Sequence, residues 1–203
     1  MHLPKMRPAR FLAALLLSLA ALPALRAMSV IPPTFSELVA EADAIVRARV
    51  VSLQPFADQS AVGEVLRTRV TFVVETTLKG RHEGGLTLEF LGGAVGELSL
   101  EVSGMPRFEP GAQDIVFVTA GTPAICPLVA MGHGRYRILR DAQGAEFVAR
   151  DNGLPLHRIE DVALPLLAPA AVPVAARPPG GRPLSPAEFA GHVRRTAARI
   201  HTP

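Results

Sequence analysis

Cysteine is nearly absent from this chain of 203 residues, which contains only Cys126, and tryptophan is absent altogether. A single cysteine excludes an intramolecular disulfide, so the fold has to be held together by its hydrophobic core. Cys126 lies in the apolar stretch TPAICPLVAM. This setting favours a buried, unreactive thiol over a reactive one.

The sequence also lacks the short motifs that mark many catalytic centres. It has no HExxH, CxxC or GxSxG motif and no glycine-rich phosphate loop ahead of a helix. The histidines beyond the N-terminal segment do not have the spacing of metal ligands: His82, His133, His157, His192 and His201. We therefore expect no enzyme activity, no cofactor and no metal ion of the protein's own.

No apolar run is long enough to cross a membrane, which takes about 20 residues. The longest one near the N-terminus, residues 11–22, has 12 residues, follows a basic segment and precedes a short region of small residues. This order predicts a signal peptide over residues 1–27, cleaved after Ala27 or, as the alternative, after Ala24. We expect the mature protein to be secreted or periplasmic, without a stable membrane span.

The numbers of basic and acidic residues are nearly equal once the predicted signal peptide is removed. The full chain carries 21 basic and 18 acidic residues, and residues 1–27 hold four of the basic ones and no acidic one, which leaves 17 against 18. Residues 28–161 carry 12 basic and 17 acidic residues, whereas residues 162–203 carry five and one. Phosphate contacts need a cationic face, so the composition of the main section disfavours binding to nucleic acid.

Alternation of apolar and polar residues dominates the main section. In residues 44–50, Arg47 and Arg49 alternate with apolar residues, and a longer run of the same kind covers residues 64–80. Shorter runs follow, separated by glycine and proline turns, at residues 86–92, 97–102, 113–120, 135–140 and 145–150. Short strands at this spacing predict an all-β domain, either a small barrel or a sandwich.

Two helices are expected at the borders of this domain. Thr34 and Glu37 form the pattern of a capping box, which predicts a short helix over residues 35–42. A proline-rich linker is expected over residues 162–183. Beyond it, an amphipathic helix is expected within residues 184–203, with Ser185 as N-cap, Glu188 completing a capping box and Pro186 in the first turn.

The apolar stripe of this C-terminal helix allows two roles. It consists of Phe189, Val193, Ala197 and Ile200. The stripe can pack onto the β domain, or it can meet a partner or a membrane surface.

The start of the expected mature chain resembles the tissue inhibitors of metalloproteinases. The resemblance rests on IPP at residues 31–33, on ADAIVRARVVS at residues 42–52 and on VTFVVETTLKG at residues 70–80. It covers residues 28–91 well and residues 92–150 loosely. It implies the OB-like barrel that this family shares with netrin modules, here of about five strands over residues 28–161.

The resemblance also implies a way to bind a protease. In the family, the α-amino group and the carbonyl oxygen of the first mature residue chelate the protease's catalytic zinc, and the second side chain points into the substrate pocket. These positions are Met28 and Ser29 here, and the family's cysteines at positions one and three are replaced by Met28 and Val30. The implied partner-binding residues are Met28, Ser29, Val30, Ile31 and Pro32.

Two functions from different classes therefore remain open. The chain is expected to be an exported, non-catalytic binding module, and its mature N-terminus would inhibit a zinc metalloprotease. Alternatively, residues 28–33 are an ordered lead-in to the barrel. The protein would then be a structural or ligand-binding barrel of the cell envelope, without inhibitory activity.

Overall fold

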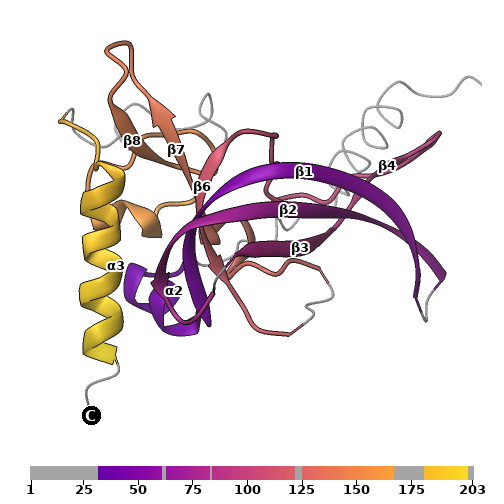
Figure 1. Ribbon diagram of the computed structural model, residues 1–203, viewed down its shortest axis with the longest axis horizontal. Coiled ribbons are helices and arrows are strands. Elements are labelled where there is room, and N and C mark those ends of the chain that lie inside the picture. The colour runs from indigo at the N-terminus through magenta and orange to yellow at the C-terminus, as the bar shows by residue number, and fades with distance from the viewer. Residues whose placement is uncertain (1–31, 61–62, 83, 122–124, 167–180, 201–203) are drawn as a thin grey trace, which may run out of the picture. The chain divides into compact units, whose positions relative to one another are not determined.

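The structure of the protein is a computed structural model that describes residues 32–60, 63–82, 84–121, 125–166 and 181–200 (Figure 1). Its main feature is an antiparallel six-stranded sheet with the strand order β3-β2-β1-β6-β7-β8. The strands are β1 (Ala44–Ser60), β2 (Gly63–Lys79), β3 (Gly85–Leu91), β6 (Gln113–Val118), β7 (Arg135–Arg140) and β8 (Glu146–Arg150). The all-β character predicted from the alternating pattern is confirmed.

Smaller elements complete the described part of the chain. A two-stranded hairpin consists of β4 (Gly93–Val95) and β5 (Leu98–Leu100). The helices are α2 (Phe35–Glu41) and α3 (Pro186–Ile200), with two short 3-10 helices, η1 (Met131–Gly134) and η2 (Ile159–Ala163). None of the helices among the described residues is long and apolar enough to cross a membrane.

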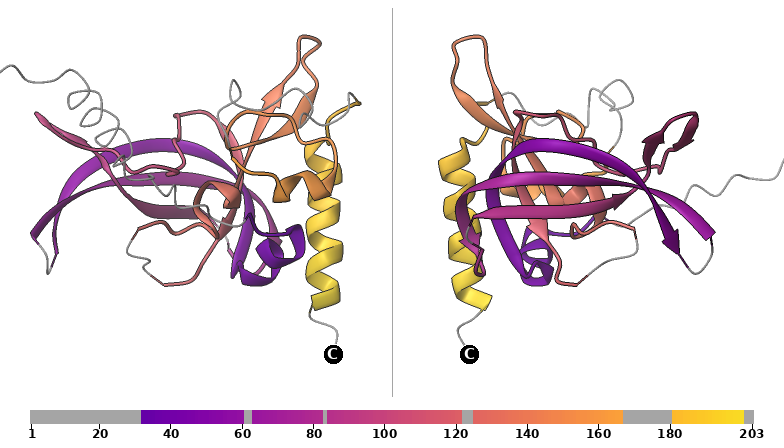
Figure 2. Two further views of the ribbon diagram at one scale, coloured as in Figure 1. Left: turned by 180° about the vertical axis from the view of Figure 1, so that it is seen from behind. Right: turned by 45° about the vertical axis from the view of Figure 1, so that its right-hand side comes forward.

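The two longest strands, β1 and β2, form a curved hairpin that extends past its neighbours (Figure 2). Strand β6 pairs with β1 only over residues 44–49, and β3 pairs with β2 only over residues 67–73. Register shifts in β1, the last of them between Val50 and Ser52, bend the strand. Pro55 is tolerated within β1 because beyond Val50 the strand has a neighbouring strand on one side only.

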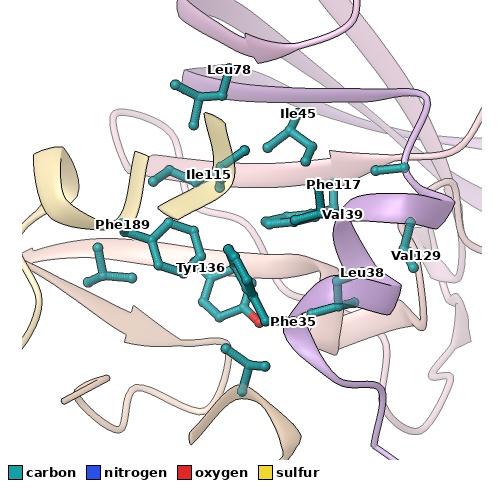
Figure 3. Close-up of a cluster of buried hydrophobic side chains, with 14 of the residues drawn as sticks. Phe35, Leu38, Val39, Ile45, Leu78, Ile115, Phe117, Val129, Tyr136 and Phe189 are labelled. Carbon is teal, nitrogen blue, oxygen red and sulfur yellow. The ribbon is translucent and has the colours of Figure 1, made fainter. Parts of the chain in front are cut away.

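The sheet buries side chains on both of its faces, and β6 shows this most clearly. Val116 and Val118 belong to one hydrophobic cluster, together with Val46, Ala48 and Val50 of β1. Ile115 and Phe117 belong to the other cluster, which is covered by α2 and α3 (Figure 3). The alternation predicted for residues 44–50 is confirmed on the first face. Because side chains alternate along a strand, residues adjacent in sequence pack into different hydrophobic clusters.

Helix α2 begins as the sequence predicts. The Glu37 backbone N–H donates to the Thr34 hydroxyl oxygen at 3.3 Å, and the Thr34 backbone N–H donates to the Glu37 carboxylate at 2.7 Å. Three side chains then bury its inner face: Phe35, Leu38 and Val39. The capping box and the buried face together fix both the start and the orientation of a helix of only seven residues.

The end of α2 is held by a lysine from the end of β2. The Lys79 ammonium donates to the backbone carbonyl oxygens of Val39 and Ala42, each at 2.6 Å, and to that of Ala40 at 3.2 Å. The last carbonyls of a helix lack partners within the helix and carry partial negative charge. Lys79 therefore connects α2 to the sheet at the point where the long hairpin ends.

We expect the Lys79→Met variant to lose about 1.5 to 3 kcal/mol of unfolding free energy, the range for hydrogen bonds to charged groups. Methionine keeps most of the stem but cannot donate to the α2 carbonyls. The measurement is a urea titration followed by circular dichroism. Arg81→Met is the control. It also removes one positive charge next to Gly80, but from a side chain that is exposed. Equal losses in both variants would contradict the capping role.

Helix α3 packs against the sheet side that α2 also covers. Phe189, Val193 and Ala197 are buried in the cluster that contains Phe35 and Phe117, whereas Ile200 is exposed. The capping box expected at its start is present, with Ser185 and Glu188 bonded reciprocally at 2.8 and 3.3 Å. The apolar stripe of this helix therefore packs onto the β domain over three of its four expected residues.

A further segment, residues 125–129, connects β6 with β3 through backbone hydrogen bonds. The Val129 N–H donates to the Phe117 carbonyl oxygen at 2.9 Å, and the Thr119 N–H donates to that of Pro127 at 3.0 Å. On its other side, the Leu91 N–H at the end of β3 donates to the Ile125 carbonyl oxygen at 2.9 Å. The sequence analysis expected no strand in this segment.

Candidate functional site

The predicted partner-binding residues lie at the edge of what the structure describes. Met28, Ser29, Val30 and Ile31 lie outside the described residues, and the same holds for the predicted signal peptide and for residues 167–180 of the expected linker. Pro32 is described and half-buried. It is followed directly by Pro33 and by the capping residue Thr34.

The residues that carry the resemblance meet at a joint between α2, β2 and β6. The Asp43 backbone N–H donates to the Val118 carbonyl oxygen at 2.9 Å, and the Asp43 carboxylate accepts from the Ala120 N–H at 2.5 Å. Gly80 has a φ of +77°, and a Cβ at this position would lie 2.4 Å from the Asp43 carbonyl oxygen. Asp43, Lys79 and Gly80 are thus structural residues that hold the chain after α2 against the sheet.

The arginines of β1 belong to a polar network on the outside of the sheet. Arg47 forms ion pairs with Glu75 at 3.1 Å and with Glu146 at 3.2 Å, and Arg49 pairs with Glu75 at 2.9 Å. Hydrogen bonds from Gln113 and ion pairs with both arginines lower the pKa of Glu75 against the effect of its partial burial. Because these charges compensate each other, we assign no binding role to them.

A second ionic group is buried inside the fold. The Arg135 guanidinium donates to both carboxylate oxygens of Asp114, at 2.9 and 3.3 Å, and to Asp151 at 3.0 Å. It also donates to the Arg107 carbonyl oxygen and stacks on the ring of Phe108, 4.3 Å from its centroid. The side chains of Arg135 and Asp114 are 2% and 0% exposed. An arginine this deeply buried requires such complete pairing.

Burial dominates the electrostatics of this group. It raises the pKa of Asp114 and of Asp151, and the Arg135 guanidinium opposes both shifts. Both carboxylates are also close enough to Arg137 to be influenced by its charge. Arg135, Asp114 and Asp151 could not be recognised as a group from the sequence, because they are separated by 16 to 37 positions in the chain and form no local motif.

An open cleft of about 470 Å³ lies next to the buried arginine, at the end of the apolar cluster between the strands. Its wall is formed by Leu53 of β1, Val70 of β2 and Phe90 of β3. The loop that follows β5 covers one side with Met105 and Phe108, and Ala94 and Ser99 of the β4–β5 hairpin lie opposite each other at its edge. The sequence analysis did not predict this cleft.

Two further candidate side chains, Cys126 and His133, are shielded from solvent in the described part of the chain. Burial raises the pKa of the Cys126 thiol to about 11, so that this thiol is protonated at neutral pH. Burial and the Arg150 charge lower the pKa of His133, which lies in η1 and is 9% exposed. Within the described ranges, no group of three or more His, Cys, Asp or Glu side chains is placed to hold a metal ion.

Comparison with known proteins assigns no family to the chain. No protein-family profile matches the sequence. No curated protein is significantly similar to it.

Proposed function

We propose that the protein is an exported, non-catalytic binding module on an OB-like barrel, and that its mature N-terminus inhibits a zinc metalloprotease. The hydrogen bonds of residues 125–129 support the barrel. These residues pair with β6 on one side and contact β3 on the other, which gives the order β1-β2-β3-(125–129)-β6-β1. The proposed OB-like barrel, a five-stranded and partly open Greek-key barrel, would consist of these five segments.

The observation that carries the inhibitory function is the anchoring of the chain just behind the tip. Pro32 and Pro33 restrict the backbone, and Thr34 starts a helix whose Phe35, Leu38 and Val39 are at most 8% exposed. Lys79 holds the other end of that helix. This anchoring fixes Pro32 and Pro33 relative to the sheet, so these two residues need no further ordering when the segment before them binds a protease.

This anchoring takes the place of the disulfides of the resembled family. There, cysteines at the first and third positions tie the tip down, whereas Met28 and Val30 cannot. The zinc ligands would be the α-amino nitrogen and the carbonyl oxygen of Met28, which are backbone atoms and need no particular side chain. An unperturbed α-amino group has a pKa of about 7.7 to 8.0, so a substantial fraction of the molecules carries a neutral N-terminal nitrogen near neutral pH.

The test is to add one alanine before Met28. The extension converts the amine of Met28 into an amide without a lone pair for zinc, and it advances the tip by about 3.5 Å. We expect the inhibition constant for a susceptible zinc protease to rise by at least about a hundredfold, which corresponds to about 2.8 kcal/mol. Ser29→Gly is the matched control, because it leaves both ligating atoms in place and is expected to change the preference among proteases.

The experiment starts with N-terminal sequencing of the exported protein, which identifies the first mature residue. A panel of zinc proteases is then titrated with the authentic chain and with the extended chain. Equal inhibition by both forms would disprove zinc chelation by the N-terminus. No inhibition by either form would leave the alternative, a structural or ligand-binding barrel of the cell envelope.

A further inference from the structure

The cleft beside β3 has a roof that is held open by the buried ionic group. Phe108 contacts Phe72 edge to face at 5.3 Å and Phe90 at 5.1 Å between ring centroids. Its other contact is the stacked guanidinium of Arg135, which Asp114 and Asp151 hold in place. A shift of Phe108 into the cleft would therefore break its stacking on the buried guanidinium and its contacts with Phe72 and Phe90.

The floor of the cleft is fixed in the same way. A Cβ on Gly93 would lie 2.6 Å from the Thr68 hydroxyl oxygen, and one on Gly92 would lie 3.0 Å from the Leu100 carbonyl oxygen. The Thr68 hydroxyl donates to the Gly92 carbonyl oxygen at 2.8 Å. These close contacts place the β4–β5 hairpin against the long hairpin and define the second side of the cleft.

The chemistry of the lining selects an apolar ligand without net charge. Most of the lining side chains are apolar, although apolar atoms make up only slightly more than half of the exposed wall. The Thr68 hydroxyl hydrogen is already used within the protein. The two charged side chains at the rim, Arg107 and Glu101, are 80% and 78% exposed and pair with each other. Neither sign of charge is therefore in excess at the entrance.

The size of the cleft sets the scale of the ligand. A volume of about 470 Å³ lies in the usual range for small-molecule sites, which is about 300 to 1,000 Å³. Covering the apolar part of this wall with a ligand removes it from water, which favours binding.

We propose that this cleft is a binding site for a small, neutral, apolar molecule, held between the inner faces of β1, β2 and β3 and the Phe108 roof. The site is independent of the N-terminal tip, because all of its walls come from residues 53–108. It would serve an inhibitor and a cell-envelope barrel equally, so its test does not depend on the proposed function.

The experiment titrates the mature protein with N-phenyl-1-naphthylamine, a neutral apolar dye whose fluorescence rises in an apolar site. We expect saturable binding of one dye per chain. The Ala94→Trp variant, which places a large ring at the edge of the cleft, is expected to raise the dissociation constant at least about tenfold. Ser99→Trp fills the same space from the opposite strand and serves as a second variant.

Leu98→Trp is the matched control. It adds the same ring to the same hairpin at an exposed residue that does not line the cleft, and it is expected to leave the dissociation constant unchanged. Unsaturable dye binding would overturn the proposal, and so would unchanged binding in both filling variants. Tighter binding of the sulfonated analogue 8-anilinonaphthalene-1-sulfonate than of the neutral dye would overturn the assigned ligand class.

Discussion

The Arg135→Met variant is expected to lose about 3 to 5 kcal/mol of unfolding free energy, the usual cost of removing one partner of a buried ion pair. Methionine fills much of the arginine stem but leaves Asp114 without its two charge-assisted hydrogen bonds and Asp151 without one. Phe108 loses the guanidinium stacked on its ring. Because domains of this size are stable by about 5 to 15 kcal/mol, urea titration should show a large fall in the midpoint.

The pH dependence of this loss provides a second readout. Burial raises the pKa of Asp114 and Arg135 lowers it, so removing Arg135 raises it further. A carboxyl group whose pKa is raised in the folded state contributes its full stability below the unfolded value of about 3.9 and loses it as the pH rises. The deficit of the variant relative to the parent chain should therefore be smaller at pH 5 than at pH 7.

Two further variants separate pairing from simple loss of charge. Arg140→Met removes an arginine that is 68% exposed and paired with Glu146, and it should cost at most about 1 kcal/mol. In the double variant Asp114→Asn with Arg135→Met, the loss should be smaller than the sum of the single losses, because the fully buried carboxylate opposite the missing guanidinium has been removed and only that of Asp151 remains. Equal costs for Arg135→Met and Arg140→Met would contradict the structural role of the buried pair.

The Phe189→Ala variant is expected to lose about 3 to 5 kcal/mol, as large-to-small changes in a packed core do. The Phe189 ring is fully buried and lies 4.7 Å from Tyr136, 5.6 Å from Phe35 and 6.3 Å from Phe117 between ring centroids (Figure 3). Its removal opens a cavity among these aromatic rings. We expect α3 to detach before the sheet unfolds, since Phe189 is its largest buried side chain.

Detachment of α3 is measured by limited proteolysis, as cleavage at sites C-terminal to residue 181. Global stability is measured by urea titration. Ile200→Ala is the control on the same helix, because Ile200 is 44% exposed, and its cost should be within about 0.5 kcal/mol. If Phe189→Ala were as stable and as protease-resistant as Ile200→Ala, α3 would not be part of the core. Its apolar stripe would then be available to a partner.

Local signals in the amino-acid sequence are sufficient to predict both capped helices and the alternating strands. Both capping boxes join residues three positions apart, and both helices begin where these boxes predict. The alternation in residues 86–92 also identified the buried side chains Leu86, Leu88 and Phe90 of β3 correctly. Such signals work because the partners of a cap or of a strand face are fixed by the geometry of a single element.

Local signals did not predict the segments whose strand conformation depends on pairing with another strand. Strand β1 continues through Pro55 to Ser60 although that stretch is largely polar. It is held in place there by its pairing with β2. Residues 125–129 pair with β6 and contact β3 although Pro127 lies within the segment. In both cases the extended conformation depends on backbone hydrogen bonds to a neighbouring strand, which the side-chain pattern of the segment itself does not report.

What the apolar stripe of the C-terminal helix contacts is seen only in the folded protein, and so is the approach of Arg135 to Asp114 and Phe108. The sequence left two roles open for the apolar stripe of α3, and the aromatic cluster around Phe189 selects one. The buried arginine could not be predicted because its carboxylate partners come from β6 and from the turn after β8. A charged side chain is stable in a core only when such partners converge on it, and their convergence is a property of the assembled sheet.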